Sequence, residues 1–251
     1  MKRAVEAAVA ALGLLILSPL LAAIALMVWL EDRRSPWFRG VRVARGGGSF
    51  RMLKFRSMHP DAWKTGVNST AEDDGRITRV GAWLRRAKLD ELPQLWNVLR
   101  GEMSLVGPRP QVPADAALYT REERRMLAVR PGITDLASVV FADEGEILKG
   151  SADPDLLYNQ IIRPWKSRLA LLYLDHRSGL IDLRIVGLTA LVLVSRARAL
   201  EGVRGILETW GADPLVQEIA RRDGALLAYP PPGAREIVSI HKVQCHQVTS
   251  A

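Results

Sequence analysis

The feature that most constrains this chain is a run of 24 residues without a charge, from Ala7 to Leu30. As one helix rising ~1.5 Å per residue, the run would be roughly 36 Å long, enough for the hydrocarbon core of a bilayer. A signal peptide has a shorter apolar core, of roughly 7–15 residues, and a small-residue cleavage site that is not evident here. The run therefore predicts a segment that associates with a membrane.

The middle of this run contains Ser18 and Pro19, with 11 uncharged residues on each side. Proline removes a backbone hydrogen bond, so a break or bend is expected there. Hydropathy alone leaves two topologies open, a kinked helix that spans the bilayer and a re-entrant hairpin that enters and leaves one leaflet. Basic residues flank the run on both sides: Lys2, Arg3, Arg33 and Arg34. By the positive-inside rule, this symmetry favours the re-entrant form.

Composition excludes several classes of protein. With 48% hydrophobic and 25% charged residues, the 251-residue chain is neither disordered nor collagen-like. Its single cysteine, Cys245, cannot form an intrachain disulfide, which fits a reducing cytoplasmic setting. A net charge of +8 favours an anionic partner, such as phospholipid, nucleic acid or a nucleotide.

Local patterns predict the elements that follow the apolar run. Residues 37–43 and 49–55 flank three glycines and predict a short β-hairpin. The polar stretch 61–78 predicts a mobile loop. Helical periodicity on both sides of Lys88 predicts two helices, the second with Asp90 as N-cap and ending before Gly101. Further helices are predicted over 119–129, 156–174 and 180–200.

Asp90 and Glu91 are adjacent carboxylates at this predicted helix start. The helix dipole and free N–H groups there favour an ionised acid and attract phosphate. Neighbouring side chains on a helix point about 100° apart, so one could attack phosphorus while the other holds Mg²⁺. On spacing alone, a capping pair is the commoner interpretation. Cations that could neutralise a phosphoryl group are Lys54, Arg56, Arg85, Arg86 and Arg109.

The segment 89–110, LDELPQLWNVLRGEMSLVGPRP, closely resembles the signature of the bacterial sugar transferase family, the monotopic polyprenyl-phosphate phosphoglycosyl transferases. Ser18-Pro19 matches the helix-breaking pair of the family's re-entrant anchor. Other segments match in the family's order: 54–58, 79–85, 130–135, 182–185 and Thr189. The chain resembles the small, single-domain form of this family.

The resemblance implies an α-rich α+β fold in three parts. Residues 1–36 would form a re-entrant helix-break-helix anchor, and 37–200 a compact cytoplasmic catalytic domain with interfacial amphipathic helices and a short β-hairpin. Residues 201–251 would be a C-terminal extension to which the resemblance assigns no role. The expected location is the cytoplasmic face of the bacterial inner membrane, in contact with an anionic phospholipid bilayer and with no nucleic acid. Whether the chain forms a homodimer stays open.

The resemblance also implies a reaction. Asp90 would attack the β-phosphorus of a UDP-sugar, expel UMP and form a covalent phosphosugar intermediate. Undecaprenyl phosphate would then take the sugar phosphate, giving the first lipid-linked unit of an exopolysaccharide or surface glycan. Glu91 would bind Mg²⁺, Arg85 and Arg109 would bind phosphate, and Lys54 and Arg56 would shape the site. The sequence does not indicate which UDP-sugar is used.

Two other functions remain as alternatives. Asp153-Pro154-Asp155 fits a metal-binding pattern of UDP-releasing glycosyltransferases, although a loop or helix cap is favoured for it. A basic scaffold on a membrane surface would explain the charge but not the signature segment. Asp182 is interpreted as a helix cap. The potential ligands His241, Cys245 and His246 do not match a zinc spacing.

Overall fold

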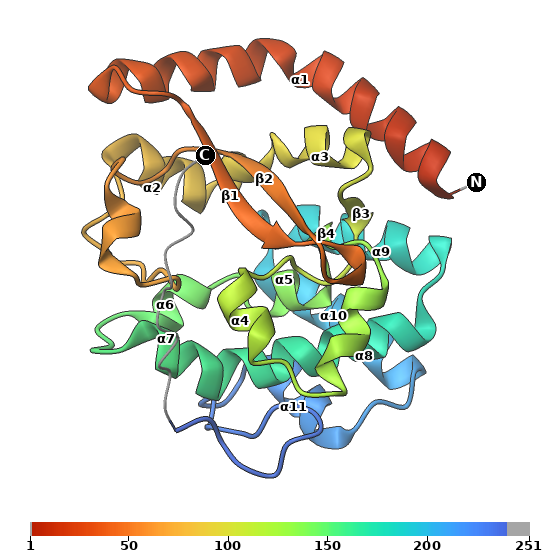
Figure 1. Ribbon diagram of the computed structural model, residues 1–251. Helices are drawn as coiled ribbons and strands as arrows, with labels where there is room; N and C mark the ends of the chain where they lie inside the picture. Colours follow the sequence, from red (N-terminus) through yellow and green to blue (C-terminus); the bar gives the residue numbers. More distant parts are fainter. Residues whose placement is uncertain (1, 240–251) are drawn as a thin grey trace.

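The apolar run forms one continuous helix in the computed structural model, which describes residues 2–239. This helix, α1, covers Lys2–Asp32 with Pro19 inside it, lies along one edge of the molecule and bends along its length (Figure 1). The Ser18 hydroxyl donates a hydrogen bond to the Leu15 carbonyl at 2.8 Å. The predicted break at Ser18 and Pro19 is thus no interruption of the helix, because the hydrogen bonds on both sides of a proline can continue.

A narrow face of α1 packs on the rest of the protein. Ala10 joins a cluster with Phe50 and Val98, and Ile24 joins another with Leu84. Only 11% of the most apolar 18-residue stretch of α1 is buried, and Leu15 is 72% exposed. The helix is long and apolar enough to cross a membrane, and its apolar surface is mostly uncovered by protein. Exposure on this scale is typical of a membrane-associated segment.

The predicted hairpin is confirmed with the predicted bounds. Strands β1, Trp37–Val43, and β2, Ser49–Phe55, pair antiparallel with Trp37 opposite Phe55. Gly46 and Gly47 have φ angles of 81° and 87°, which side chains other than glycine's rarely accept. The triple glycine is therefore a turn, as the pattern predicted.

The region around the signature differs from its prediction at one point. Helix α2 covers Arg79–Arg86 and α3 covers Gln94–Arg100, with a short 3₁₀ turn, η3, at Leu89–Glu91 between them. Asp90 lies inside this turn, so the prediction that it is the N-cap of α3 was wrong. Pro93 precedes α3 and has no N–H to be capped, so the helix can start without the carboxylate. Gly101 ends α3 in the left-handed region, as predicted.

A second, parallel pair of strands was not predicted. Strands β3, Ser104–Val106, and β4, Gly132–Thr134, are three residues each, too short for a period-two pattern to identify. They approach closely at two glycines, since a Cβ on Gly132 would lie 2.1 Å from the Gly107 nitrogen. This pair carries the turn that contains Arg109.

Beyond the turn that contains Arg109, the regular elements of the described chain other than β4 are helices. Their bounds are α4 Pro113–Ala117, η4 Glu123–Ala128, α5 Leu136–Val140, α6 Glu144–Leu148, α7 Pro154–Leu157, the π-helical turn η5 Tyr158–Ile162, α8 Arg163–His176, α9 Gly179–Val192, α10 Arg196–Thr209 and α11 Pro214–Arg221. The helix predicted over 119–129 is a six-residue 3₁₀ helix, and the one predicted over 180–200 is two helices. The α-rich fold with a short hairpin is thereby confirmed.

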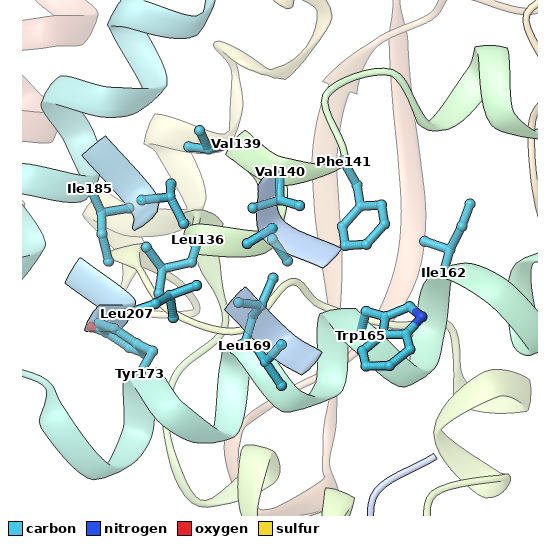
Figure 2. Close-up of a cluster of buried hydrophobic side chains, with 14 of the residues drawn as sticks. Leu136, Val139, Val140, Phe141, Ile162, Trp165, Leu169, Tyr173, Ile185 and Leu207 are labelled. Atoms are coloured by element: carbon cyan, nitrogen blue, oxygen red, sulfur yellow. The ribbon is translucent and has the colours of Figure 1, made fainter. Parts of the chain in front are cut away.

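The main hydrophobic core lies among α5, α8, α9 and α10 (Figure 2). Leu136, Trp165 and Tyr173 are almost fully buried there. Leu207 of α10 also belongs to this core, so residues beyond 200 pack with the residues before them. The expected boundary at 200 lies inside α10.

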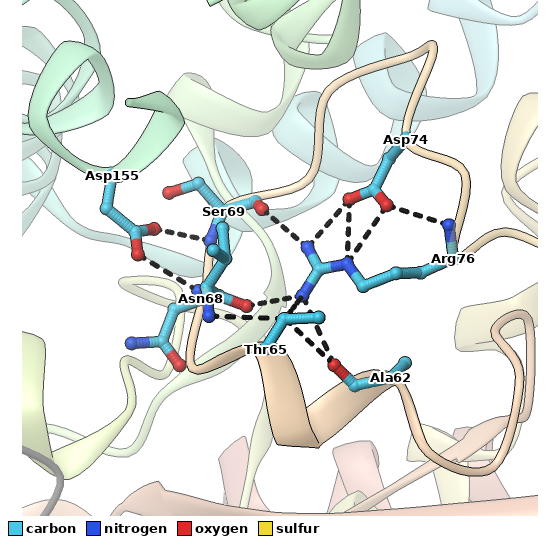
Figure 3. A network of polar contacts seen from close by, with 8 residues as sticks. Ala62, Thr65, Asn68, Ser69, Asp74, Arg76 and Asp155 are labelled. Atoms are coloured by element: carbon cyan, nitrogen blue, oxygen red, sulfur yellow. Dashed lines mark hydrogen bonds and ion pairs between the residues drawn. The ribbon is translucent and has the colours of Figure 1, made fainter. Parts of the chain in front are cut away.

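The polar stretch 61–78 is fastened by side chains (Figure 3). Asp155 accepts hydrogen bonds from the backbone N–H groups of Asn68 at 3.1 Å and Ser69 at 2.6 Å. Arg76 pairs with Asp74 at 2.6 Å and donates to the Val67 carbonyl at 2.7 Å. These contacts give an irregular loop a defined path beside the rest of the molecule.

Candidate active site

A cleft of about 510 Å³ brings together five of the six residues predicted to act in catalysis or substrate binding. Four different parts of the chain supply them: the end of β2, the last turn of α2, the turn η3 and the segment after β3. They are Lys54, Arg85, Asp90, Glu91 and Arg109. Because Lys54 and Arg109 are distant in sequence from Asp90, their meeting with it in one cleft is a property of the fold. Residues of the signature and of two other matching segments, 54–58 and 79–85, therefore lie together in one cleft.

Glu91 is held by two cations. Lys54 Nζ donates to Glu91 Oε1 at 2.7 Å, and Arg109 contacts both carboxylate oxygens, with one bond of 3.1 Å to Oε2. Burial would raise the pKa of Glu91, but Arg109 and Lys54 hold it well below its usual range. Glu91 is therefore a fixed negative charge at any physiological pH.

Asp90 has the opposite electrostatic environment. Its side chain is buried, with 5% of the residue exposed, and among residues 2–239 no cation is within ion-pair distance of it. Burial raises the pKa of Asp90, Lys54 opposes this, and the charge of Glu91 adds to the rise. A carboxylate that is poorly solvated and not tied up in an ion pair is suited to nucleophilic attack.

The polar part of the cleft contains more than the predicted residues. Lys88 lies beside Asp90 with a left-handed φ of 56° and donates to the Ala142 carbonyl at 3.3 Å. Glu144 and Lys166 form an ion pair that also lines the cleft. Burial would raise the pKa of Glu144, and Lys166 lowers it instead. Sequence reasoning missed this pair because nothing local marks Glu144 or Lys166 as neighbours of the signature.

The cleft also has a large apolar lining. This lining comes from η3, α3, both short parallel strands and α9: Leu89, Leu92, Leu95, Leu105, Ile133, Val186, Ala190, Val192 and Leu193. Val186 is 41% exposed and Leu193 is 57% exposed. Leu180 and Leu183 of α9 are 68% and 69% exposed and do not line the cleft, so α9 carries apolar surface both in the cleft and outside it. One cleft can receive a polar group and a hydrocarbon chain side by side.

Arg56, the sixth predicted residue, lies outside the cleft. Its guanidinium makes two bonds to Asp32, of 2.8 and 2.6 Å, and a third to the Ser35 carbonyl at 2.8 Å. Strand β2 ends at Phe55, so Arg56 no longer follows the direction that places Lys54 in the cleft. In this structure Arg56 joins the end of α1 to the hairpin.

The carboxylates of the Asp-Pro-Asp segment hold protein backbone. Asp153 accepts a hydrogen bond from the Leu156 N–H at 2.9 Å and caps α7, while Asp155 fastens the loop 61–78. The structure thus agrees with the loop-or-cap interpretation. The interpretation of Asp182 as a helix cap was wrong, because the Ser178 side chain caps α9. Asp182 accepts from the Tyr173 hydroxyl at 2.6 Å and pairs with Lys2 at 2.8 Å, away from the cleft. His241, Cys245 and His246 are outside the described residues.

A magnesium ion in this cleft would be bound by Glu91 together with the phosphates of the substrate. Among the residues that the structure describes, no group of three or more His, Cys, Asp or Glu side chains is placed to hold a metal. A carboxylate offers about four lone-pair positions, and the contacts of Glu91 leave a position at Oε2. Mg²⁺ is commonly held by one or two carboxylates plus substrate phosphates, so the donor set fits when a diphosphate is bound.

Comparison with known proteins identifies the relatives of this chain. The profile of a family described as bacterial sugar transferase matches residues 1–196. The UDP-glucose:undecaprenyl-phosphate glucose-1-phosphate transferase of Caulobacter vibrioides is 40% identical over 172 residues, 66% of this chain and 64% of that protein. The exopolysaccharide production protein PSS of Rhizobium leguminosarum bv. phaseoli is 35% identical over 209 residues, 79% of this chain and 97% of that protein.

The name of the Caulobacter vibrioides relative agrees with the predicted enzyme class, a transferase that moves a sugar 1-phosphate to a polyprenyl phosphate. The matched region contains the whole cleft. Signature, cleft and profile all lead to one assignment: the chain belongs to the bacterial sugar transferase family.

Proposed function

We propose that this protein transfers a sugar 1-phosphate from a UDP-sugar to undecaprenyl phosphate and releases UMP. The observation that carries the proposal is the contrast between Asp90 and Glu91 inside one cation-rich cleft. The name of the Caulobacter vibrioides relative supplies the donor class and the acceptor, and the Rhizobium leguminosarum relative is named as an exopolysaccharide production protein. The product would be the first lipid-linked unit of an exopolysaccharide or surface glycan.

The first step is an attack of the Asp90 carboxylate on the β-phosphorus of the UDP-sugar. A bond forms between an Asp90 oxygen and this phosphorus, and the bond from phosphorus to the bridging oxygen breaks. UMP leaves with that oxygen, and the sugar phosphate stays on Asp90 as an acyl phosphate. In the second step, a phosphate oxygen of undecaprenyl phosphate attacks the same phosphorus and Asp90 leaves as a carboxylate.

Cations at the cleft stabilise the charge that builds up during both steps. Lys54 and Arg109 contact Glu91, and Arg85 and Lys88 also line the cleft. Fixed positive charges aimed at a transferring phosphoryl group lower the barrier because they need no reorganisation. When bound, Mg²⁺ at Glu91 would supply further neutralisation of the diphosphate. Glu91 itself keeps Lys54 and Arg109 in place.

The division of the cleft suits two substrates that come from different phases. The nucleotide sugar would occupy the polar part, and the prenyl chain would follow the apolar wall of α9 toward the exposed apolar surface. We propose α1 as a re-entrant anchor at the cytoplasmic face of the inner membrane, in contact with anionic phospholipid. Basic residues near both of its ends support this topology.

The experiment is nucleotide release from a panel of UDP-sugars. Purified protein in nanodiscs would be incubated with Mg²⁺, undecaprenyl phosphate and each donor, comparing wild type, Asp90→Asn and Asp153→Asn. We expect UMP from wild type and from Asp153→Asn, whose asparagine still caps α7, and none from Asp90→Asn. Release of UDP that depends on Asp153 would establish direct glycosyl transfer instead. No release with any donor would favour the scaffold alternative.

A further inference from the structure

One wall of the cleft is the five-residue segment 141–145. Four of its residues line the cleft, among them Glu144, which forms the ion pair with Lys166. Asp143 is the exception, since it does not line the cleft and contacts the C-terminal helices instead. The segment is thus held from two sides: cleft residues contact its inner side, and the C-terminal part of the chain contacts its outer side.

The outer contacts come from two arginines. Asp143 Oδ2 lies 2.8 Å from Arg196 Nη2 and 2.9 Å from Arg222 Nη2. The guanidinium of Arg222 also lies over the Phe141 ring, 5.5 Å from its centroid. The side chains of Arg222 and Asp143 are 10% and 14% exposed, so solvent screens their attraction much less than at a surface pair.

Arg222 has a position that calls for an explanation. It follows α11 with a left-handed φ of 60°, a conformation that costs energy for any residue with a Cβ. It also lies beyond residue 196, where the family profile ends, while Asp143 lies inside the profile. The C-terminal extension, through Arg222, therefore contacts the wall of a cleft whose residues all lie within the family profile.

Contacts on the cleft side of this wall link it to residues that line the cleft. Lys88 donates to the Ala142 carbonyl at 3.3 Å, and the backbone N–H of Glu72 donates to the Gly145 carbonyl at 2.8 Å. Glu144 and Lys166 offer an acceptor and a donor at the polar part of the cleft, the chemistry that sugar hydroxyl groups require. A shift of this wall would move Glu144 relative to Asp90.

We propose that Arg222, together with Arg196, is a positioning residue that fixes the wall 141–145 and thereby sets how tightly and how selectively the sugar of the donor is held. This inference rests on the proposed function. It gives the C-terminal extension a role in donor recognition at a distance, because Arg222 contacts the wall and not the cleft.

The test compares donor kinetics of purified variants in nanodiscs. Arg222→Ala should raise the KM for the preferred UDP-sugar about tenfold, narrow the difference between preferred and poor donors, and change kcat much less. Arg222→Lys should restore part of the effect. Arg221→Ala is the matched control, since Arg221 is the exposed neighbour on α11 and should behave as wild type.

Two further variants separate positioning from folding. Arg222→Gly removes the side chain and relieves the left-handed backbone, so it should keep the thermal midpoint while showing the raised donor KM. Asp143→Asn combined with Arg222→Ala should add little to either single change. Unchanged donor KM and selectivity in Arg222→Ala and Arg222→Gly, with an active wild type, would overturn this inference alone. Absence of UMP release from wild type would instead refute the proposed function.

Discussion

A buried ion pair in the core and the charged group in the cleft differ in how their charges are balanced. In the core, Arg163 pairs with Glu123 at 2.6 Å, with side chains 4% and 0% exposed. Ser167 and the Thr120 N–H also donate to Glu123, at 2.7 and 3.0 Å. In the cleft, by contrast, five cations and three carboxylates line a cavity.

This difference separates a structural role from a functional one. The core pair is closed, because one positive and one negative charge satisfy each other with neutral donors around them. The cleft group has an excess of positive charge next to space for a ligand, which a diphosphate would neutralise. The excess of charge, more than burial itself, indicates which group acts on a substrate.

The strongest test of the comparison is Asp90→Asn. We expect turnover to fall by about 10³-fold or more, because an amide is not a nucleophile for phosphorus. The thermal midpoint should not fall, because the change removes a buried charge that has no ion-pair partner among the described residues. UMP release and thermal unfolding would be measured on one preparation. A large loss of stability would show that Asp90 is a structural residue.

The core pair should respond in the opposite way. Arg163→Met should lower the free energy of unfolding by about 3–5 kcal/mol, because it leaves Glu123 buried without its partner. Turnover per folded molecule should stay near wild type at a temperature where the variant is folded. Combining it with Glu123→Gln should recover part of the loss, as denaturant unfolding would measure. Unchanged stability in the single variant would contradict a closed pair.

Glu91→Gln tests whether Lys54 and Arg109 depend on the negative charge of Glu91 for their positions. We expect kcat/KM for the donor to fall about 10²-fold, because Lys54 and Arg109 lose the charge that holds them. The Mg²⁺ concentration for half-maximal rate should rise as well, and a titration of the metal would measure it. Equal metal dependence in both proteins would remove Glu91 from the metal site.

The dependence on pH is the smallest expected effect. The rate should fall on the acid side as Asp90 is protonated, at a pH above its ordinary pKa of 3.8, while Glu91 with its lowered pKa stays ionised.

The same two pKa shifts make stability depend on pH. Ionised Asp90 destabilises the fold, and this destabilisation is complete once pH has risen through its raised pKa. Glu91 stabilises the fold above pH 4.5, and this stabilisation is lost as pH falls through its lowered pKa. Asp90→Asn should therefore gain thermal stability over wild type at neutral pH and lose that gain near pH 3. A gain independent of pH would assign it to packing.

Local sequence patterns predicted the elements that depend on local chemistry. The hairpin has its predicted bounds because three glycines permit the turn, and α3 ends where Gly101 accepts a left-handed conformation. The start of α3 was wrong because Pro93, and not a capping carboxylate, determines it. The strands β3 and β4 could not be predicted, since three residues carry no periodic signal.

The site was predictable where a motif carried it and not elsewhere. The signature gave Asp90, Glu91 and Arg109, but the Glu144–Lys166 pair arises from helices that only the tertiary fold brings to the cleft. Arg56 looked equivalent to Lys54 in sequence, and the end of β2 separates them. Charge type predicts possible chemistry, whereas the direction of each side chain requires the fold.

The close approach of Gly107 and Gly132 has a consequence for how the chain tolerates mutation. Any side chain at position 132 would collide with backbone, which cannot move aside as the tip of a flexible side chain can. The displaced strand would carry the loop of Arg109 with it. In a library of all single substitutions selected for glycan production, position 132 should therefore accept nothing but glycine. Such a selection would score it like Asp90, although it does not line the cleft.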